Sequence, residues 1–189
     1  MRPNGDSPVA VQLATVVEPD QWAKQVTQAT ATLTTRNQLY MGFWEPLIER
    51  IKDTYPGWTS MSTPSKDSWM VLPSGKSYPW YGLVFTREKR RRIELYVDGP
   101  DEAAQQHLWE QLTAQREAID AALPGLTWEP REGKRASRLA LYSPFEASVE
   151  KEDEWETFRD WIIDNLGPFR TVLQPHIDQL EPLGTTDAT

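Results

Sequence analysis

Apolar residues recur at spacings of three and four between Asn37 and Tyr55, and this period predicts an amphipathic helix. Pro56-Gly57 ends the pattern. Pro46 lies inside it and predicts a kink or the true first turn of the helix. The apolar positions are Tyr40, Phe43, Trp44, Leu47, Ile48, Ile51 and Tyr55.

The same period predicts three further helices. One runs from Pro100 to about Leu123. Another follows the acidic stretch EASVEKEDEWE, and Gly167-Pro168 separates it from a last helix. Five short segments between the helices are rich in aromatic and β-branched residues, which is typical of strands. They are SWMVL, YGLVF and IELYVD, then LTWEP and SRLALYS.

The resulting order is α-β-β-β-α-β-β-α-α, which predicts an α+β fold. We expect an antiparallel sheet of about five strands with helices mainly on one face. Residues 1–35 are expected to form an N-terminal arm and linker, residues 36–182 a single domain, and residues 183–189 a disordered tail. The Thr-rich part of the arm, TQATATLTTR, lacks an apolar face.

Composition adds limits to this picture. The chain has 189 residues, of which 39% are hydrophobic and nine are tryptophan, enough for the core of one domain. Cysteine is absent, which excludes disulfides and cysteine-based metal sites. No apolar run approaches the ~20 residues of a membrane span, and the N-terminus lacks the apolar core of a signal peptide. We therefore expect a cytoplasmic protein without membrane contact.

The segment REKRRR is a dense cluster of positive charge at the tip of a predicted hairpin. Alternation along the following strand places Ile93, Leu95 and Val97 on the helix-covered face and the intervening polar residues on the open face. A second hairpin tip, REGKRASR, is also basic. If the two tips lie side by side, they form one cationic patch that contacts the phosphates of DNA or RNA without reading sequence.

The predicted contact residues are Arg87, Lys89, Arg90, Arg91, Arg92, Lys134, Arg135 and Arg138, with Arg131, Lys66 and Lys76 as further candidates. Aromatic side chains near the patch could stack on bases. These are Trp69, Tyr96 and Tyr142, with Tyr81 as an additional candidate.

An alternative is a protein-interaction or dimerisation module with no nucleic-acid contact. The chain as a whole is acidic, with a formal net charge of -8, and charged hairpin tips also keep sheet edges soluble. The acidic run from Glu146 to Glu156 could neutralise the basic residues internally. Nine tryptophans leave enough aromatic surface for a homodimer interface or for another domain.

Catalytic motifs are missing from the sequence. The segment PSGKS resembles a phosphate-binding loop, but Met70 occupies the position of its first glycine. His107 and His176 are far apart and have no partner at ligand spacing. We therefore expect no catalytic residues, no metal and no cofactor. An enzyme that uses scattered carboxylates is the third-ranked hypothesis.

Four blocks in a fixed order carry a family resemblance. They are FWEPLIERIKDTYPGWTSMSTPSKDSWMVL, YGLVFTREKRRRIELYVD, LTWEPREGKRASRLALY and WIIDNLGPFRTVLQPHIDQL. Together, over about residues 37–181, they resemble the bacterial domain-of-unknown-function family 4268. In that family the domain often follows a restriction-endonuclease-like nuclease domain. The resemblance implies a nuclease-domain partner and an accessory role in nucleic-acid metabolism or phage defence. It implies no reaction and no active-site residues.

Overall fold

A computed structural model describes residues 19–183 apart from 131, 132 and 134, with side chains from Thr35 onward. The chain divides into two compact units, Met1–Thr35 and Arg36–Thr189. The expectations for residues 1–18 and for the tail at 184–189 lie outside the described residues. The second unit contains the sheet and the helices that pack on it.

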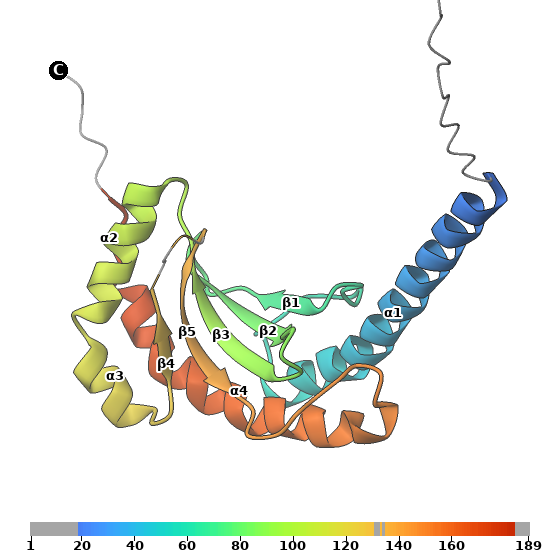
Figure 1. Ribbon diagram of the computed structural model, residues 1–189. Helices are drawn as coiled ribbons and strands as arrows, with labels where there is room; N and C mark the ends of the chain where they lie inside the picture. The colour runs from blue at the N-terminus through green and yellow to red at the C-terminus, as the bar shows by residue number, and fades with distance from the viewer. Residues whose placement is uncertain (1–18, 131–132, 134, 184–189) are drawn as a thin grey trace, which may run out of the picture. The chain divides into compact units, whose positions relative to one another are not determined.

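The sheet has five strands, all antiparallel, in the spatial order β1-β2-β3-β5-β4 (Figure 1). This confirms the predicted fold class. The strand β3 lies at the centre of the sheet, with β2 on one side and β5 on the other. The strands are β1 (Trp69–Leu72), β2 (Trp80–Phe85), β3 (Arg91–Val97), β4 (Thr127–Glu129) and β5 (Ser137–Tyr142).

Helices contribute the second layer. They are α1 (Pro19–Thr54), α2 (Glu102–Thr113), α3 (Arg116–Ala122), the short 3-10 helix η1 (Glu152–Glu154) and α4 (Trp155–Asp178). In Figure 1, α4 runs beneath the strands, and no helix of the second unit from α2 onward covers the opposite side of the sheet. None of the described helices is both long enough and apolar enough to span a membrane.

The helices differ from the sequence-based expectation at three places. The Thr-rich segment 27–36 is helical, because no Gly or Pro interrupts α1 before Gly42. The helix α4 continues through Gly167-Pro168, since Leu166 and Phe169 on either side are fully buried and their packing outweighs the lost backbone hydrogen bond. Conversely, the helix predicted to reach Leu123 divides into α2 and α3, next to a Thr113 hydroxyl that bonds to the Trp109 carbonyl.

The core lies between the sheet and the helices. Ile93, Leu95 and Val97 are each 0% exposed, as the alternation along β3 predicts. The neighbouring strands repeat the pattern, with the apolar side chains of α1, α2 and α4 packed against them. The buried residues from β2 and β5 are Tyr81, Leu83, Phe85 and Leu139. Because all of these side chains point toward the helices, the alternate residues of each strand form the opposite, open face.

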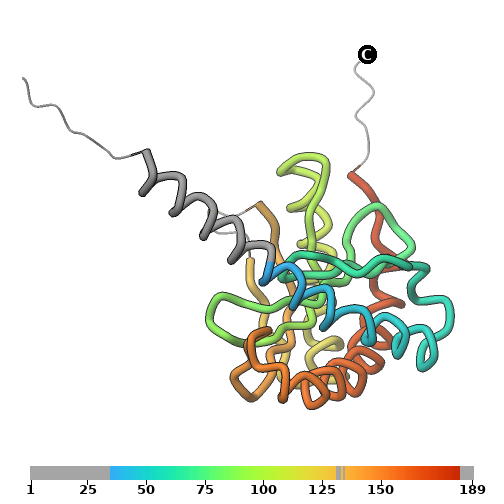
Figure 2. Tube along the Cα trace, turned by 90° about the vertical axis from the view of Figure 1, so that its right-hand side faces the viewer, coloured from blue at the N-terminus to red at the C-terminus, as the bar shows by residue number. Residues whose placement is uncertain are grey.

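The loop between β1 and β2 approaches the C-terminal end of α4 (Figure 2). Lys76 Nζ donates to the carbonyl oxygens of Asp178, at 2.9 Å, and Leu180, at 2.6 Å. A cation at this position bonds to carbonyls that the helix leaves unpaired and also favours its negative end. Lys76 therefore stabilises a helix terminus, which accounts for one of the cations that the sequence suggested as a ligand contact.

One charged side chain, Arg91, lies within the core. It is 1% exposed, and its guanidinium carbon is 3.7 Å from the ring centre of Phe85 and 3.9 Å from that of Phe158. Phe43 completes the cage at 4.4 Å. No hydrogen-bond acceptor within the described chain reaches its three side-chain nitrogens. Burial, and secondarily the nearby Arg159 charge, lower the pKa of Arg91 to about 8.

We expect Arg91→Met to leave the free energy of unfolding unchanged or to raise it by about 1–2 kcal/mol. Methionine keeps the ring contacts, and it removes a desolvated charge whose cost exceeds that of an apolar group of similar volume. Urea denaturation followed by circular dichroism would measure the change. A loss above about 2 kcal/mol would show instead that cation–π attraction at the three rings exceeds the desolvation cost.

Candidate binding site on the open face of the sheet

The two basic hairpin tips lie at opposite ends of the sheet. Arg92 pairs with Tyr142 at one end of the β3–β5 ladder, and Val97 pairs with Ser137 at the other. The turn before β3 and the turn before β5 are therefore separated by at least the length of this ladder, roughly 17 Å. The predicted merging of the two tips into one cationic patch is wrong, because β5 runs antiparallel to β3.

The basic residues of the first tip have different environments. Arg87, Lys89 and Arg90 are exposed in the β2–β3 turn. The guanidinium of Arg90 lies 4.5 Å from the ring centre of Tyr142. Arg91, which the sequence analysis included among the phosphate contacts, is enclosed in the core and cannot reach a ligand at the surface. That expectation was wrong because Arg91 alternates with the open-face residues of β3 and shares the helix-facing side with Ile93.

The second tip is less completely described. Lys134 and Arg131 lie outside the described residues. The Arg135 side chain is 77% exposed, and its Nε donates to Asp98 at 2.8 Å. Arg138 belongs to β5 itself and lies on the open face of the sheet.

The remaining candidates fall outside the open face. Tyr81 is 0% exposed and packs edge-on against Phe169, so it offers no stacking surface. Lys66 precedes β1.

The acidic run 146–156 does not neutralise the first tip through any ion pair recorded between described residues. Its partners in those pairs are Arg36, Arg50, Lys151 and Arg159.

The open face carries two ridges of large side chains that cross the strands. Strand register places Trp69, Val84, Arg92 and Tyr142 in one row. It places Trp80, Tyr96, Arg138 and Glu129 in a parallel row, four residues farther along the strands or roughly 13 Å away. The row between them contains Val71, Gly82, Glu94, Ala140 and Thr127, which include the smallest side chains of the face.

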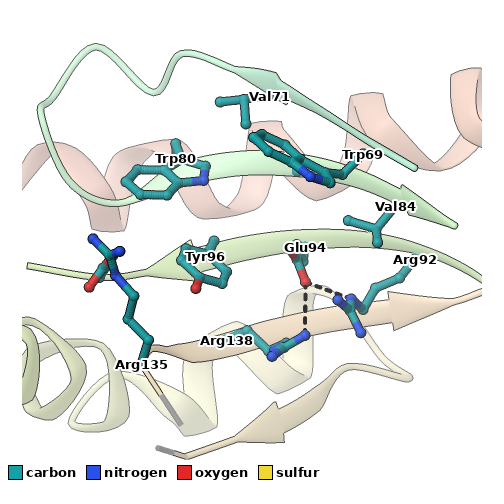
Figure 3. A pocket seen from close by; sticks show the side chains of 11 residues that line it. Trp69, Val71, Trp80, Val84, Arg92, Glu94, Tyr96, Arg135 and Arg138 are labelled. Carbon is teal, nitrogen blue, oxygen red and sulfur yellow. Dashed lines mark hydrogen bonds and ion pairs between the residues drawn. The ribbon is translucent and has the colours of Figure 1, made fainter. Parts of the chain in front are cut away.

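This middle row forms a trough with a volume of about 400 Å³ above β1, β2 and β3. Figure 3 shows Trp80 and Tyr96 toward one side of the trough and Val84 and Arg92 toward the other, with Glu94 between them. A volume of this size lies in the range of sites that bind small molecules or single chemical groups. We refer to it below as the trough.

Aromatic rings line both sides of the trough. Trp69 is 51% exposed, an unusual environment for the largest apolar side chain. Trp80 stacks on Tyr96 with 5.1 Å between ring centres and 24° between planes. The two ring faces are thus held by neighbouring strands before any ligand arrives, which lowers the entropic cost of stacking on them.

Glu94 lies at the floor of the trough and is 5% exposed. Its Oε2 forms an ion pair with Arg92 Nε at 2.5 Å and accepts a hydrogen bond from Arg138 Nη1 at 3.5 Å. The side chain lies across Gly82 of the neighbouring strand. A Cβ at that glycine would be 2.9 Å from Glu94 Cγ and 3.0 Å from Oε1, so any larger residue would displace the carboxylate.

Burial and the two arginines act in opposite directions on Glu94. Loss of solvent raises its pKa and is the largest influence, while the charges of Arg92 and Arg138 lower it; the net shift is upward. The same pattern holds for Tyr142, whose pKa is raised by burial and by its hydrogen bond to Glu129. Arg92 Nη1 also donates to the Tyr142 hydroxyl at 3.3 Å. Arg92 therefore connects Glu94 with Tyr142 in one network.

The charges of this network nearly cancel. Arg92, Arg138 and Arg135 are matched by Glu94, Glu129 and Asp98, through distances of 2.5–3.5 Å. In the described part of the chain, no group of three His, Cys, Asp or Glu side chains could hold a metal ion. The arrangement offers flat aromatic surfaces, a fixed carboxylate and fixed guanidinium donors. It is suited to binding a planar polar group.

Sequence reasoning found Trp69, Tyr96 and Tyr142 but missed Trp80 and Gly82. Both were detectable in principle, because alternation through WYGLVF places Trp80, Gly82 and Val84 on one face. A glycine inside a strand also often indicates close approach of another group. The trough itself required the register between strands, which the sequence does not give.

We expect Gly82→Ala to lower the free energy of unfolding by about 1–3 kcal/mol. The new methyl group would overlap Glu94, which its two arginines hold in place. Gly42→Ala is the matched control, because its Cβ would meet only Trp155 at an ordinary 3.4 Å. Thermal denaturation of the Gly82→Ala and Glu94→Ala variants and their double mutant gives the coupling. Additive effects would contradict direct overlap of the two side chains.

Comparison with known proteins gives one family. The chain matches the family described as Domain of unknown function (DUF4268) over residues 39–177, which include all five strands and all of α4 except its last residue. No curated protein and no solved structure matches it. Since the matched region covers most of the chain, the protein belongs to the DUF4268 family.

Proposed function

We propose that the domain is a non-catalytic accessory module that binds single-stranded nucleic acid on the open face of its sheet. The observation that carries this proposal is the trough, with aromatic rings on both sides. Bases of a single strand are unpaired and can stack on such rings, each stacked base contributing ~1–3 kcal/mol. In a duplex the base faces are stacked on one another, so these rings would add nothing to its binding.

Exposed arginines lie toward both ends of the strands, Arg90 outside the lining of the trough and Arg135 within it. Arg90 stacks on Tyr142 at one end of the strands, and Arg135 is held by Asp98 at the other. A strand that runs along β3 would pass from one to the other and cross the trough between them. Arg87 and Lys89 in the adjoining turn add two exposed cations for phosphates. The two hairpin tips thus support the proposal as separate anchor points.

The charge balance predicts the character of the binding. Arg92 and Arg138 are paired with carboxylates, so they release few counterions from a nucleic acid. Stacking then supplies most of the affinity, and salt weakens it only moderately. The role as an accessory to a nuclease-type partner, in nucleic-acid metabolism or phage defence, follows from the family resemblance and is part of the same proposal.

Fluorescence anisotropy with labelled single strands of about 12 nucleotides tests the proposal. We expect Trp69→Ala to weaken binding about tenfold, because it removes an exposed stacking surface. Met41→Ala, which removes another exposed apolar side chain outside the trough, should leave binding unchanged. No binding by DNA or RNA strands at about 50 mM salt, or equal loss in both variants, would overturn the proposal.

The salt dependence gives a second, independent measurement. If about three phosphates are contacted, the slope of log affinity against log salt should be about −2, since each contributes about −0.7. Arg87→Glu combined with Lys89→Glu should reduce this slope, whereas Lys52→Glu on α1 should not. A slope steeper than about −5 would contradict binding dominated by stacking.

A protein-interaction module is the second candidate, and the neutral charge of the open face favours it. Trp69 lies beside Val71 and Val84, and their exposed surface could pack against a second copy of the chain. Sedimentation velocity over a hundredfold range of concentration would detect such a dimer. If this candidate is correct, we expect the unmodified protein to form a dimer and the Trp69→Arg variant to be monomeric. A monomer throughout would reject self-association.

A further inference from the structure

The trough has a chemically specific floor. The carboxylate of Glu94 occupies it, between the ring of Trp69 on one side and the stacked pair of Trp80 and Tyr96 on the other. Carboxylates near a nonspecific stacking surface repel phosphate and reduce affinity. A buried acid at the centre of such a surface therefore needs a different explanation.

The two oxygens of Glu94 have different surroundings. Oε2 is engaged by both arginines, through an ion pair with Arg92 and a hydrogen bond from Arg138. Among the described residues, no group donates a recorded hydrogen bond to Oε1, which lies against the backbone of Gly82 on the trough floor. Oε1 can therefore accept one or two hydrogen bonds from a ligand.

Donors are available beside this acceptor. Arg92 uses Nε for Glu94 and Nη1 for Tyr142, and Arg138 uses Nη1 for Glu94 and Nε for Glu129. Each guanidinium has a further terminal nitrogen that carries donor hydrogens. The floor thus presents an acceptor with donors next to it, held in place by ion pairs.

We propose that the trough recognises guanine, through Glu94 and one of its two arginines, with the base stacked against Trp69 or Trp80. This inference rests on the proposed binding of a planar base at the same site. The Watson–Crick edge of guanine presents an acceptor, O6, followed by two donors, N1–H and N2–H. Glu94 Oε1 accepts from the two donors, and a guanidinium nitrogen of Arg92 or Arg138 donates to O6.

The other bases fit this floor less well. Adenine and cytosine each place an unprotonated ring nitrogen beside a single amino donor, and that nitrogen would face a carboxylate oxygen. Uracil and thymine present one donor between two acceptors. Because Glu94 is largely removed from water, an unmatched acceptor beside it would cost more than the same mismatch at an exposed site.

The same chemistry could come from a guanine within a strand or from a free guanine nucleotide. Competition experiments distinguish these sources. The probe is a labelled oligothymidine of about 12 nucleotides with one central guanine, adenine, cytosine or inosine. The competitor is GMP, with AMP as control. Displacement by GMP at micromolar concentration would assign the site to the free nucleotide, and strand-only binding would assign it to nucleic acid.

We expect the guanine strand to bind about tenfold more tightly than the adenine strand. Inosine lacks only the N2 amino group, so its affinity should lie between the two. Glu94→Gln should abolish the preference, because an amide replaces one acceptor by a donor. This variant could also disturb the ion pairs; the inosine result on the unmodified protein tests the same hydrogen bond without any substitution.

The outcomes separate the two proposals. If no strand binds and GMP does not bind either, both the proposed function and guanine recognition fail. If every strand binds equally and inosine matches guanine, the open face binds nucleic acid but guanine recognition is wrong. If guanine is preferred but Glu94→Gln preserves the full preference while thermal stability is unchanged, the assignment to Glu94 is wrong.

Discussion

The register of β3 determines both the core and the candidate site, because this central strand carries a charged residue on each face. Arg91 projects among three phenylalanine rings from β2 and two helices, and Glu94 projects to the open face and lies across Gly82. A slip of one residue would exchange the faces and place Arg92 and Glu94 in the helical layer. Ile93, Leu95 and Val97 make this slip costly, since all three would lose their burial. The precision of the trough is therefore a consequence of how firmly the core fixes one strand.

The sequence predicted the fold well where periodicity alone decides. Five strands and the inward side chains of β3 follow from alternation, and the second half of α1 follows from its apolar stripe. Prediction failed where tertiary packing overrides local signals, as at Gly167-Pro168, which lies within an unbroken helix. It also failed for the convergence of the hairpin tips, because that depends on the direction of β5 relative to β3. Most aromatic candidates were found, but Gly82 gains its meaning only when Glu94 is known to lie opposite it.

The open face differs from the electrostatic surface that its arginines suggested at first. Most of its cations already have carboxylate partners, and the groups that remain available are ring faces, one carboxylate oxygen and the outer guanidinium nitrogens. If the proposed binding holds, such a surface would discriminate between ligands by shape and by hydrogen-bond pattern, with charge contributing little to affinity. This agrees with a chain whose formal net charge is -8 and which nonetheless concentrates arginine along two neighbouring strands.

The two exposed arginines at the ends of the sheet are chemically unequal. The guanidinium of Arg90 lies over a tyrosine ring, whereas Arg135 is held by a buried aspartate. A linear ligand that touches both would meet two differently held guanidinium groups, so its two directions along β3 are not equivalent. Polarity of this kind would let a neighbouring domain always meet the same end of the bound chain, whichever molecule that chain belongs to.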